Sequence, residues 1–159
     1  MQRIEISIPE QSLVLLEEAR EIARYSVSTS RKGAGELRGS FCTPRGEHIV
    51  RAKIGAGQPL NAVFVRRRPT GEIWTPELGE RFPGRDWILT RILWLSGCEL
   101  GKNRLGEMDT MQRYIYIHGS PDTVPMGKPG SIGCIRMRNR DVVELFEMVS
   151  ARTPVNIAA

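Results

Sequence analysis

The chain has 159 residues, enough for one domain with a buried core, and we expect a single domain over residues 1–159. Hydrophobic residues make up 40% and charged residues 26%, a composition that excludes disordered and fibrous classes. The net charge of +5 favours anionic partners, but the arginines are scattered and no nucleic-acid-binding motif accompanies them, so we expect carboxylate-bearing ligands and no nucleic acid.

The chain begins MQRIEISIPE, without the basic and apolar segments of a signal peptide, and no apolar run is long enough to cross a bilayer. If Met1 is the natural start, we expect a cytoplasmic protein with no membrane contact; a signal peptide already removed would place it in the periplasm. Cys42, Cys98 and Cys134 are too few and too far apart for a disulfide framework, which fits a reducing compartment.

Residues 4–8 alternate isoleucine with polar side chains, which predicts a strand. Residues 13–16 and 24–30 are two further strand candidates. A helix over residues 13–25 is the rival interpretation, because the leucines and the Glu-Arg pairs also suit a period of 3.6. Periodicity alone does not decide between them.

Glycine and proline recur through residues 33–46 and predict loops. Residues 48–54 then return to an extended pattern. Residues 62–66 and 71–74, separated by Arg-Pro-Thr-Gly, predict a hairpin, and the dense apolar run 87–95 predicts a buried strand.

Residues 113–117 alternate as Arg-Tyr-Ile-Tyr-Ile, which predicts a strand that ends at His118 and turns Tyr116 and His118 to one face. Asn139 has the chemistry of an N-cap for a helix that runs to about residue 150, and residues 154–157 predict a last strand. Strands dominate, so we predict a mainly β sandwich or barrel with a C-terminal helix.

Cys134 is the candidate nucleophile. A thiol attacks as thiolate, so it needs a neighbour that accepts its proton, and His118 lies sixteen residues earlier at a predicted strand end. Gly133 lets the backbone approach a reacting carbonyl, so that N–H groups of this turn could bind an oxyanion, and Arg136 would lie on the same side as the thiol. A lone cysteine is also commonly a buried core residue, and the spacing leaves both interpretations open.

Two segments, YIHGS at residues 116–120 and SIGCIRM at residues 131–137, resemble the signature of the L,D-transpeptidase catalytic domain, or YkuD, family. The Thr-Pro-Arg-Gly turn at residues 43–46, the helix-like DVVELFEMV and the strand-like TPVNI resemble further ordered motifs of that family. The resemblance spans nearly the whole chain. It implies a β-sandwich or barrel fold and strands rather than a helix over residues 13–25.

The resemblance also implies chemistry on peptidoglycan stem peptides, in which a cysteine attacks the carbonyl at the L-centre of diaminopimelate and expels D-alanine. It makes Cys134 the nucleophile and His118 the general base, with Gly133 and Cys134 offering oxyanion N–H groups. The candidate substrate-binding residues are Arg136, Ser131, Gly119 and Tyr116.

One position departs from the family pattern: Ile132 stands where the family carries a histidine before the glycine. With water as acceptor the reaction is that of an L,D-carboxypeptidase, which we favour because the chain resembles members without export signals that recycle peptidoglycan fragments. Transfer to an amine, as in an L,D-transpeptidase, and an inactive fragment-binding protein are the alternatives. We expect a monomer with a peptidoglycan-derived peptide as partner, and neither cofactor nor metal.

Overall fold

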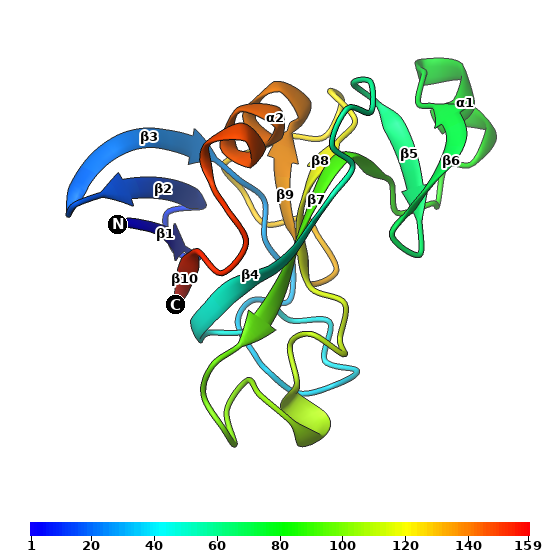
Figure 1. The fold of residues 1–159 in the computed structure, drawn as a ribbon. Helices are drawn as coiled ribbons and strands as arrows, with labels where there is room; N and C mark the ends of the chain where they lie inside the picture. The colour runs from blue at the N-terminus through cyan, green and yellow to red at the C-terminus, as the bar shows by residue number, and fades with distance from the viewer.

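The computed structural model describes residues 1–159, in which a ten-stranded sheet curls into a half-barrel with a C-terminal helix (Figure 1). The strand order is β3-β2-β1-β10-β4-β7-β5-β6; β8 also pairs with β7, and β9 pairs with β8. This confirms the predicted fold class. The strands are β1 (Gln2–Ser7), β2 (Ser12–Glu17), β3 (Arg20–Ser26), β4 (Gly46–Ile54), β5 (Ala62–Val65), β6 (Arg68–Ile73), β7 (Ile88–Gly97), β8 (Tyr116–Ser120), β9 (Ile135–Arg138) and β10 (Pro154–Ala158). The helices are α1 (Pro76–Arg81), the short 3₁₀ turn η1 (Gly106–Met108) and α2 (Asn139–Met148).

The N-terminal segment forms strands, so the helical interpretation of residues 13–25 is wrong. Strands β2 and β3 make an antiparallel hairpin whose two-residue turn, Glu18 and Ala19, has φ of 50° and 65°. Strand β1 pairs with β2 and, in parallel, with the last strand β10. The alternation at residues 4–8 is confirmed, because Ile4 and Ile6 are fully buried.

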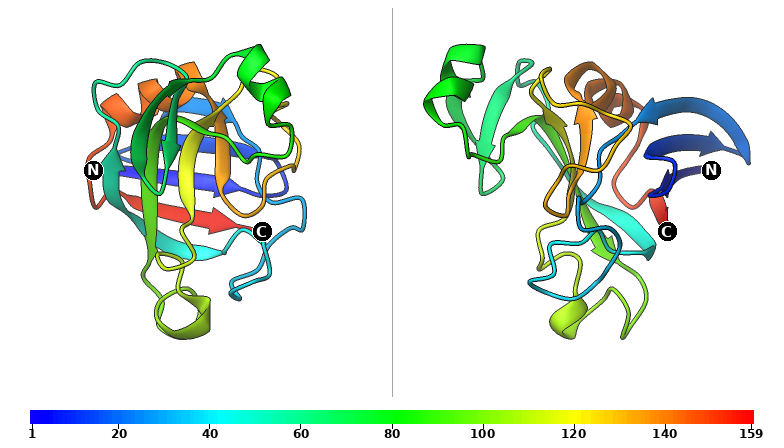
Figure 2. Two further views of the ribbon diagram at one scale, coloured as in Figure 1. Left: turned by 90° about the vertical axis from the view of Figure 1, so that its right-hand side faces the viewer. Right: turned by 180° about the vertical axis from the view of Figure 1, so that it is seen from behind.

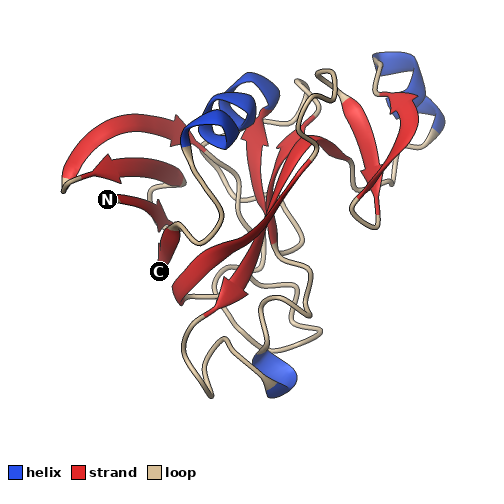
Figure 3. Cartoon of the chain, in the orientation of Figure 1, coloured by secondary structure: helices blue, strands red, loops and turns tan.

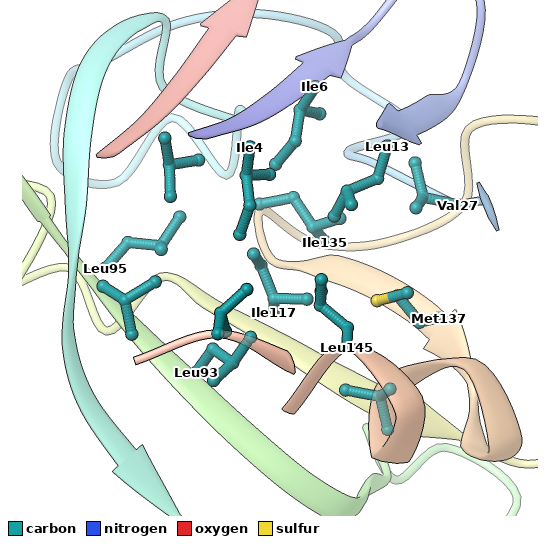
Figure 4. Packing of buried hydrophobic residues seen from close by; sticks show 14 of the residues in the cluster. Ile4, Ile6, Leu13, Val27, Leu93, Leu95, Ile117, Ile135, Met137 and Leu145 are labelled. Carbon is teal, nitrogen blue, oxygen red and sulfur yellow. The ribbon is translucent and has the colours of Figure 1, made fainter. Parts of the chain in front are cut away.

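The main core joins the two halves of the curl (Figure 4). Ile4 and Leu13 come from the N-terminal strands, Ile117 and Ile135 from the central parallel pair, and Leu145 from α2. Each is fully buried, and full burial of such a side chain contributes roughly 1.5–3 kcal/mol. One face of β8 and β9 is therefore fixed to the core, and their other face is left for a site.

The predicted hairpin exists, but its turn is not where the prolines and glycines suggested. Strands β5 and β6 are joined by Arg66 and Arg67, whose φ values are 50° and 65°, while Pro69 lies inside β6. The hairpin and α1 stand on the far side of β7 from the N-terminal strands (Figures 1 and 2). The turn formed by Arg66 and Arg67 therefore lies away from the main core.

Strand β3 covers Arg20–Ser26 and not residues 24–30, because the chain turns back directly after β2 at Glu18 and Ala19. Two boundaries close to the candidate site also differ from prediction. Strand β8 begins at Tyr116 because Tyr114 adopts φ of 57°, so His118 lies within the strand instead of at its end. Asn139 is the first residue of α2 and not its cap; its side chain bonds to Asn61 and Thr90.

Loops gather at one end of the sheet (Figure 3). Residues 27–45 meet residues 98–115 there, with the Arg38 N–H donating to Glu107 O at 2.7 Å. No helix combines the length and apolar character needed to cross a membrane.

Candidate active site

Strands β8 and β9 bring the predicted histidine and cysteine to one face of the sheet. The pairing is parallel, with Ile117 opposite Ile135 and His118 opposite Arg136. Since side chains alternate along a strand, the isoleucines enter the main core, while His118 faces the other way together with Tyr116 and Cys134. Cys134 immediately precedes β9, so it is a diagonal neighbour of His118.

His118 is fully buried and oriented by the backbone. Its Nδ1 lies 2.6 Å from the Gly119 carbonyl oxygen, which can only accept, so Nδ1 carries the hydrogen and Nε2 keeps a lone pair. Nε2 is buried and has no hydrogen-bond partner. Burial lowers the pKa of His118; the Asp86 carboxylate opposes this shift and the Arg136 guanidinium adds to it. The imidazole is therefore neutral at neutral pH and able to accept a proton.

Cys134 is half-buried and lies in the wall of a pocket. Its Sγ accepts a hydrogen bond from the Tyr116 N–H at 3.3 Å and donates to the Tyr114 carbonyl at 3.4 Å. Burial raises the pKa of the thiol to about 12, while the Tyr116 N–H, Arg136 and Arg113 act against the rise. The resting group is a thiol, and no hydrogen bond joins it to His118.

The turn before Cys134 is built by side-chain bonds to its backbone. Ser131 Oγ donates to the Cys134 carbonyl at 2.6 Å and accepts the Gly133 N–H at 3.2 Å, and Thr43 Oγ1 donates to the Gly133 carbonyl at 2.9 Å. Gly133 has φ of +133°, which favours glycine. Of the two expected oxyanion donors, the Gly133 N–H is thus already engaged, whereas the Cys134 N–H has no acceptor in the protein.

The pocket beside Cys134 has a volume of about 420 Å³ and carries an excess of positive charge. Three of its residues are arginines, and Asp86 is its one acid. The lining residues are Phe41, Arg66, Arg67, Asp86, Ile88, Arg113, Tyr114, Ile115, Tyr116, Ile132 and Cys134. A cavity with this charge suits a ligand that carries carboxylates.

Two of the arginines are held in different ways. The Arg67 guanidinium lies 4.8 Å from the ring centroids of both Trp94 and Tyr114, and its Nη1 donates to Tyr116 Oη at 3.0 Å. Its other N–H groups have no acceptor in the protein, so they are available to a ligand. Arg113 instead holds the loop, donating to backbone carbonyls that include that of Cys42 at 2.7 Å.

The predicted substrate-binding residues separate into two groups. Tyr116 lines the pocket, and Arg136 reaches its edge through an ion pair with Asp86 at 2.8 Å. Ser131 and Gly119 are buried outside the lining and shape the backbone around Cys134 and His118.

Sequence reasoning did not find Arg67, Arg113 or Asp86. Residues 66–68 are three consecutive arginines, which in the sequence contribute only to the net charge, and nothing local marks Asp86 as a partner of Arg136. His48 is structural: it is buried and its ring nitrogens lie 2.9 Å from Gly46 O and Thr110 Oγ1. No group of three or more His, Cys, Asp or Glu side chains is arranged to hold a metal ion.

The sequence profile of the L,D-transpeptidase catalytic domain, YkuD, matches residues 1–157. The YkuD protein of Bacillus licheniformis is 30% identical over 155 residues, which cover 98% of this chain and 64% of that protein. The YkuD protein of Bacillus subtilis is 37% identical over 94 residues, covering 59% and 47%. The chain thus spans less than two thirds of the length of these curated relatives.

Solved structures share the fold. An L,D-transpeptidase from Mycobacterium smegmatis has a TM-score of 0.59 at 18% identity, covering 99% of this chain and 58% of that one. L,D-transpeptidase 3 from Mycobacterium tuberculosis has a TM-score of 0.60 at 15% identity, covering 99% and 60%. With the profile match over nearly the full length, these findings show that the chain belongs to the L,D-transpeptidase catalytic domain, or YkuD, family.

Proposed function

We propose that the chain is a cysteine-dependent L,D-carboxypeptidase that removes the terminal D-alanine from peptidoglycan stem tetrapeptides through an acyl-enzyme on Cys134. The observation that carries this proposal is the position of the thiol. Cys134 lines a cationic pocket and shares a sheet face with a buried His118 whose Nε2 is free. A thiol in a cavity wall and a neutral imidazole on the same face of the adjoining strand supply the nucleophile and the base that acyl transfer by a cysteine requires.

Acylation begins when the Cys134 side chain turns from the Tyr114 carbonyl toward His118, since catalytic hydrogen bonds are often loose before substrate binds. Nε2 accepts the thiol proton while the sulfur bonds to the carbonyl carbon at the L-centre of diaminopimelate. The free Cys134 N–H donates to the developing oxyanion. The C–N bond then breaks, His118 returns the proton to the leaving amine, and D-alanine departs.

Deacylation repeats the same steps with water. His118 accepts a proton from the water as its oxygen bonds to the thioester carbon, the S–C bond breaks, and the proton passes to the departing sulfur. The products are a tripeptide with a new carboxyl group and the free Cys134 thiol, so each cycle consumes one water molecule.

The charge of the pocket favours hydrolysis over transfer. Arg66, Arg67 and Arg113 outnumber Asp86, so the pocket attracts the carboxylates of the donor peptide. The same charge repels the ammonium group of an acceptor peptide, whereas water is neutral and is not repelled.

Transfer to an amine is the second candidate, and Ile132 favours it. This side chain is 41% exposed at the pocket wall, where the family histidine is missing, and it leaves an apolar edge against which an acceptor stem could lie. An L,D-transpeptidase activity would form crosslinked dimers or exchange the terminal residue.

The test is incubation of the purified chain with disaccharide-tetrapeptide, followed by mass spectrometry. We expect loss of one alanine without dimers, and abolition of this loss by Cys134→Ala but not by Cys42→Ala or Cys98→Ala, which remove the other free thiols. Dimers or exchange with added D-amino acids would instead establish the transferase. Binding without turnover would show a fragment-binding protein, and undiminished turnover by Cys134→Ala would refute the proposed nucleophile.

A further inference from the structure

A group of hydrogen-bonded polar side chains lies next to His118, outside the pocket and outside the chemistry described above. Thr90 of β7 and Asn139 of α2 are buried, and Asn61 before β5 is half-buried. Thr90 Oγ1 donates to Asn139 Oδ1 at 2.6 Å and accepts the Asn61 N–H at 3.0 Å, while Asn139 Nδ2 donates to Asn61 Oδ1 at 2.8 Å. These bonds fix the Asn139 amide in a single orientation.

The fixed amide occupies the space where residue 119 would carry a side chain. A Cβ built on Gly119 would lie 2.4 Å from Asn139 Oδ1 and 2.6 Å from the Leu89 carbonyl oxygen, closer than real Cβ contacts come. Gly119 is therefore clamped between the first residue of α2 and the backbone of β7. This contact is the reason why a glycine must follow His118.

The backbone of β7 is strained at the same point. Leu89 pairs with Gly119 and Ile92 with His118, so two extra residues of β7 bulge opposite one step of β8. Thr90, in this bulge, has φ of +76°, which is rare for a β-branched residue and costs about 1–3 kcal/mol. The hydrogen bonds of its hydroxyl group hold that conformation in place.

The clamped residue is also the one that orients the imidazole. His118 Nδ1 donates to the Gly119 carbonyl at 2.6 Å, and this bond leaves Nε2 as the proton acceptor. We propose that Asn139 is a positioning residue for His118: its amide, locked by Thr90 and Asn61, fixes the Gly119 carbonyl that holds the imidazole in one orientation and one tautomer. The role of this positioning in catalysis rests on the function proposed above.

The test compares Asn139→Leu with Asn139→Asp and with a matched control, Asn103→Leu. Asn103 is equally buried, makes three side-chain hydrogen bonds to backbone, and fills the place of a missing side chain at Gly97, 2.3 Å from the Cβ position. It contacts neither His118 nor the pocket, so it reports on the cost of losing a buried asparagine alone.

The first readout is the tautomer of His118 by long-range ¹⁵N–¹H NMR, which requires no substrate. The chain has only two histidines, so His48→Gln assigns the signals. We expect the pure Nδ1–H tautomer in the wild type and in Asn103→Leu. Asn139→Asp should keep it as well, because the aspartate retains the oxygen that accepts from Thr90 and contacts Gly119, and the Asn61 amide can turn its Nδ2 toward the new carboxylate oxygen. Asn139→Leu should give a mixture of tautomers.

The second readout is tetrapeptide turnover. A base misplaced by about 1 Å costs on the order of 100-fold, so kcat should fall about 100-fold in Asn139→Leu, with KM unchanged and no fall in Asn103→Leu. If Asn139→Leu does not fold, Thr90→Val and Thr90→Ser replace it; the valine removes the hydroxyl and should mix the tautomers, whereas the serine keeps it and should not.

A pure Nδ1–H tautomer in both Asn139→Leu and Thr90→Val, or an equal fall of kcat in Asn103→Leu, would overturn the positioning role. A wild-type chain without turnover would refute the proposed function instead, and the tautomer comparison would still decide whether Asn139 positions His118.

Discussion

Burial holds both members of the proposed catalytic pair in their neutral forms. It raises the pKa of Cys134 and lowers that of His118, so the resting pair is a thiol and an imidazole and not a thiolate and an imidazolium. Proton transfer must then accompany attack on the substrate. The water-excluding surroundings that suppress the free thiolate also strengthen the hydrogen bond that the Cys134 N–H offers to an oxyanion.

His48 gives a prediction for stability against pH. Burial lowers its pKa from 6.5 to about 4, so the unfolded chain binds a proton at a higher pH than the folded chain does. The stability that depends on a neutral His48 is fully present above pH 6.5 and is lost as the pH falls from 6.5 to 4. The wild type should lose about 3 kcal/mol more over this interval than His48→Gln, measured by urea unfolding. Parallel curves for the two proteins would contradict this assignment.

The secondary-structure elements show which features local sequence can predict. Strand β1 followed from its isoleucine alternation, because half-buried strands impose that period. The prediction that Asn139 is the N-cap of α2 was wrong, because its side chain accepts a hydrogen bond from Thr90 and does not bond to the helix backbone. The turn at Arg66 and Arg67 was misplaced because two non-glycine residues adopt positive φ there, which no propensity indicates.

The residues of the candidate site also separate into those that the sequence indicates and those that it does not. Cys134 and His118 were predictable because their segments carry the family signature. Arg67 and Asp86 were not, since the β5–β6 hairpin and the segment before β7 reach the pocket only through tertiary packing. One sequence was therefore enough to propose Cys134 and His118 as the reacting groups, but it did not indicate Arg67 and Asp86, which line the pocket beside the thiol.

The β5–β6 hairpin should determine how tightly a carboxylate-bearing substrate binds. Arg67 is stacked on Trp94 and Tyr114, and several of its N–H groups have no acceptor in the protein. A hydrogen bond to a charged group contributes about 1.5–3 kcal/mol. Arg67→Ala should raise KM for the tetrapeptide at least about tenfold and leave kcat unchanged. Arg68→Ala removes the adjacent exposed arginine, which does not line the pocket, and should change neither constant. A loss of kcat with constant KM in Arg67→Ala would show that Arg67 does not act through substrate binding.

At the scale of the whole molecule, one core supports both the curl of the sheet and the site. Ile117 and Ile135 are buried on the inner face of the two strands whose outer face carries His118 and Cys134. The stability of the fold and the placement of His118 and Cys134 therefore depend on the same packing, but the proposed reaction takes place on the opposite face of the strands.

Removal of a core side chain should accordingly destabilise the protein without changing its chemistry. Leu145 of α2 is fully buried in the main core. Leu145→Ala should lower the free energy of unfolding by about 2–5 kcal/mol, and kcat of the folded protein should stay constant. Leu100→Ala, at a side chain 71% exposed, is the matched control and should change neither quantity. Equal unfolding free energies for the two variants would contradict the packing described here.

The proposed mechanism requires that the sulfur of Cys134 carries the substrate acyl group during turnover. Intact-protein mass spectrometry of a reaction with disaccharide-tetrapeptide, quenched in acid within the first turnovers, tests it directly. We expect an adduct with the mass of the substrate less D-alanine, mapped to Cys134 and absent from Cys134→Ala. Turnover without an adduct on Cys134, or an adduct on Cys42 or Cys98 that persists in Cys134→Ala, would contradict it.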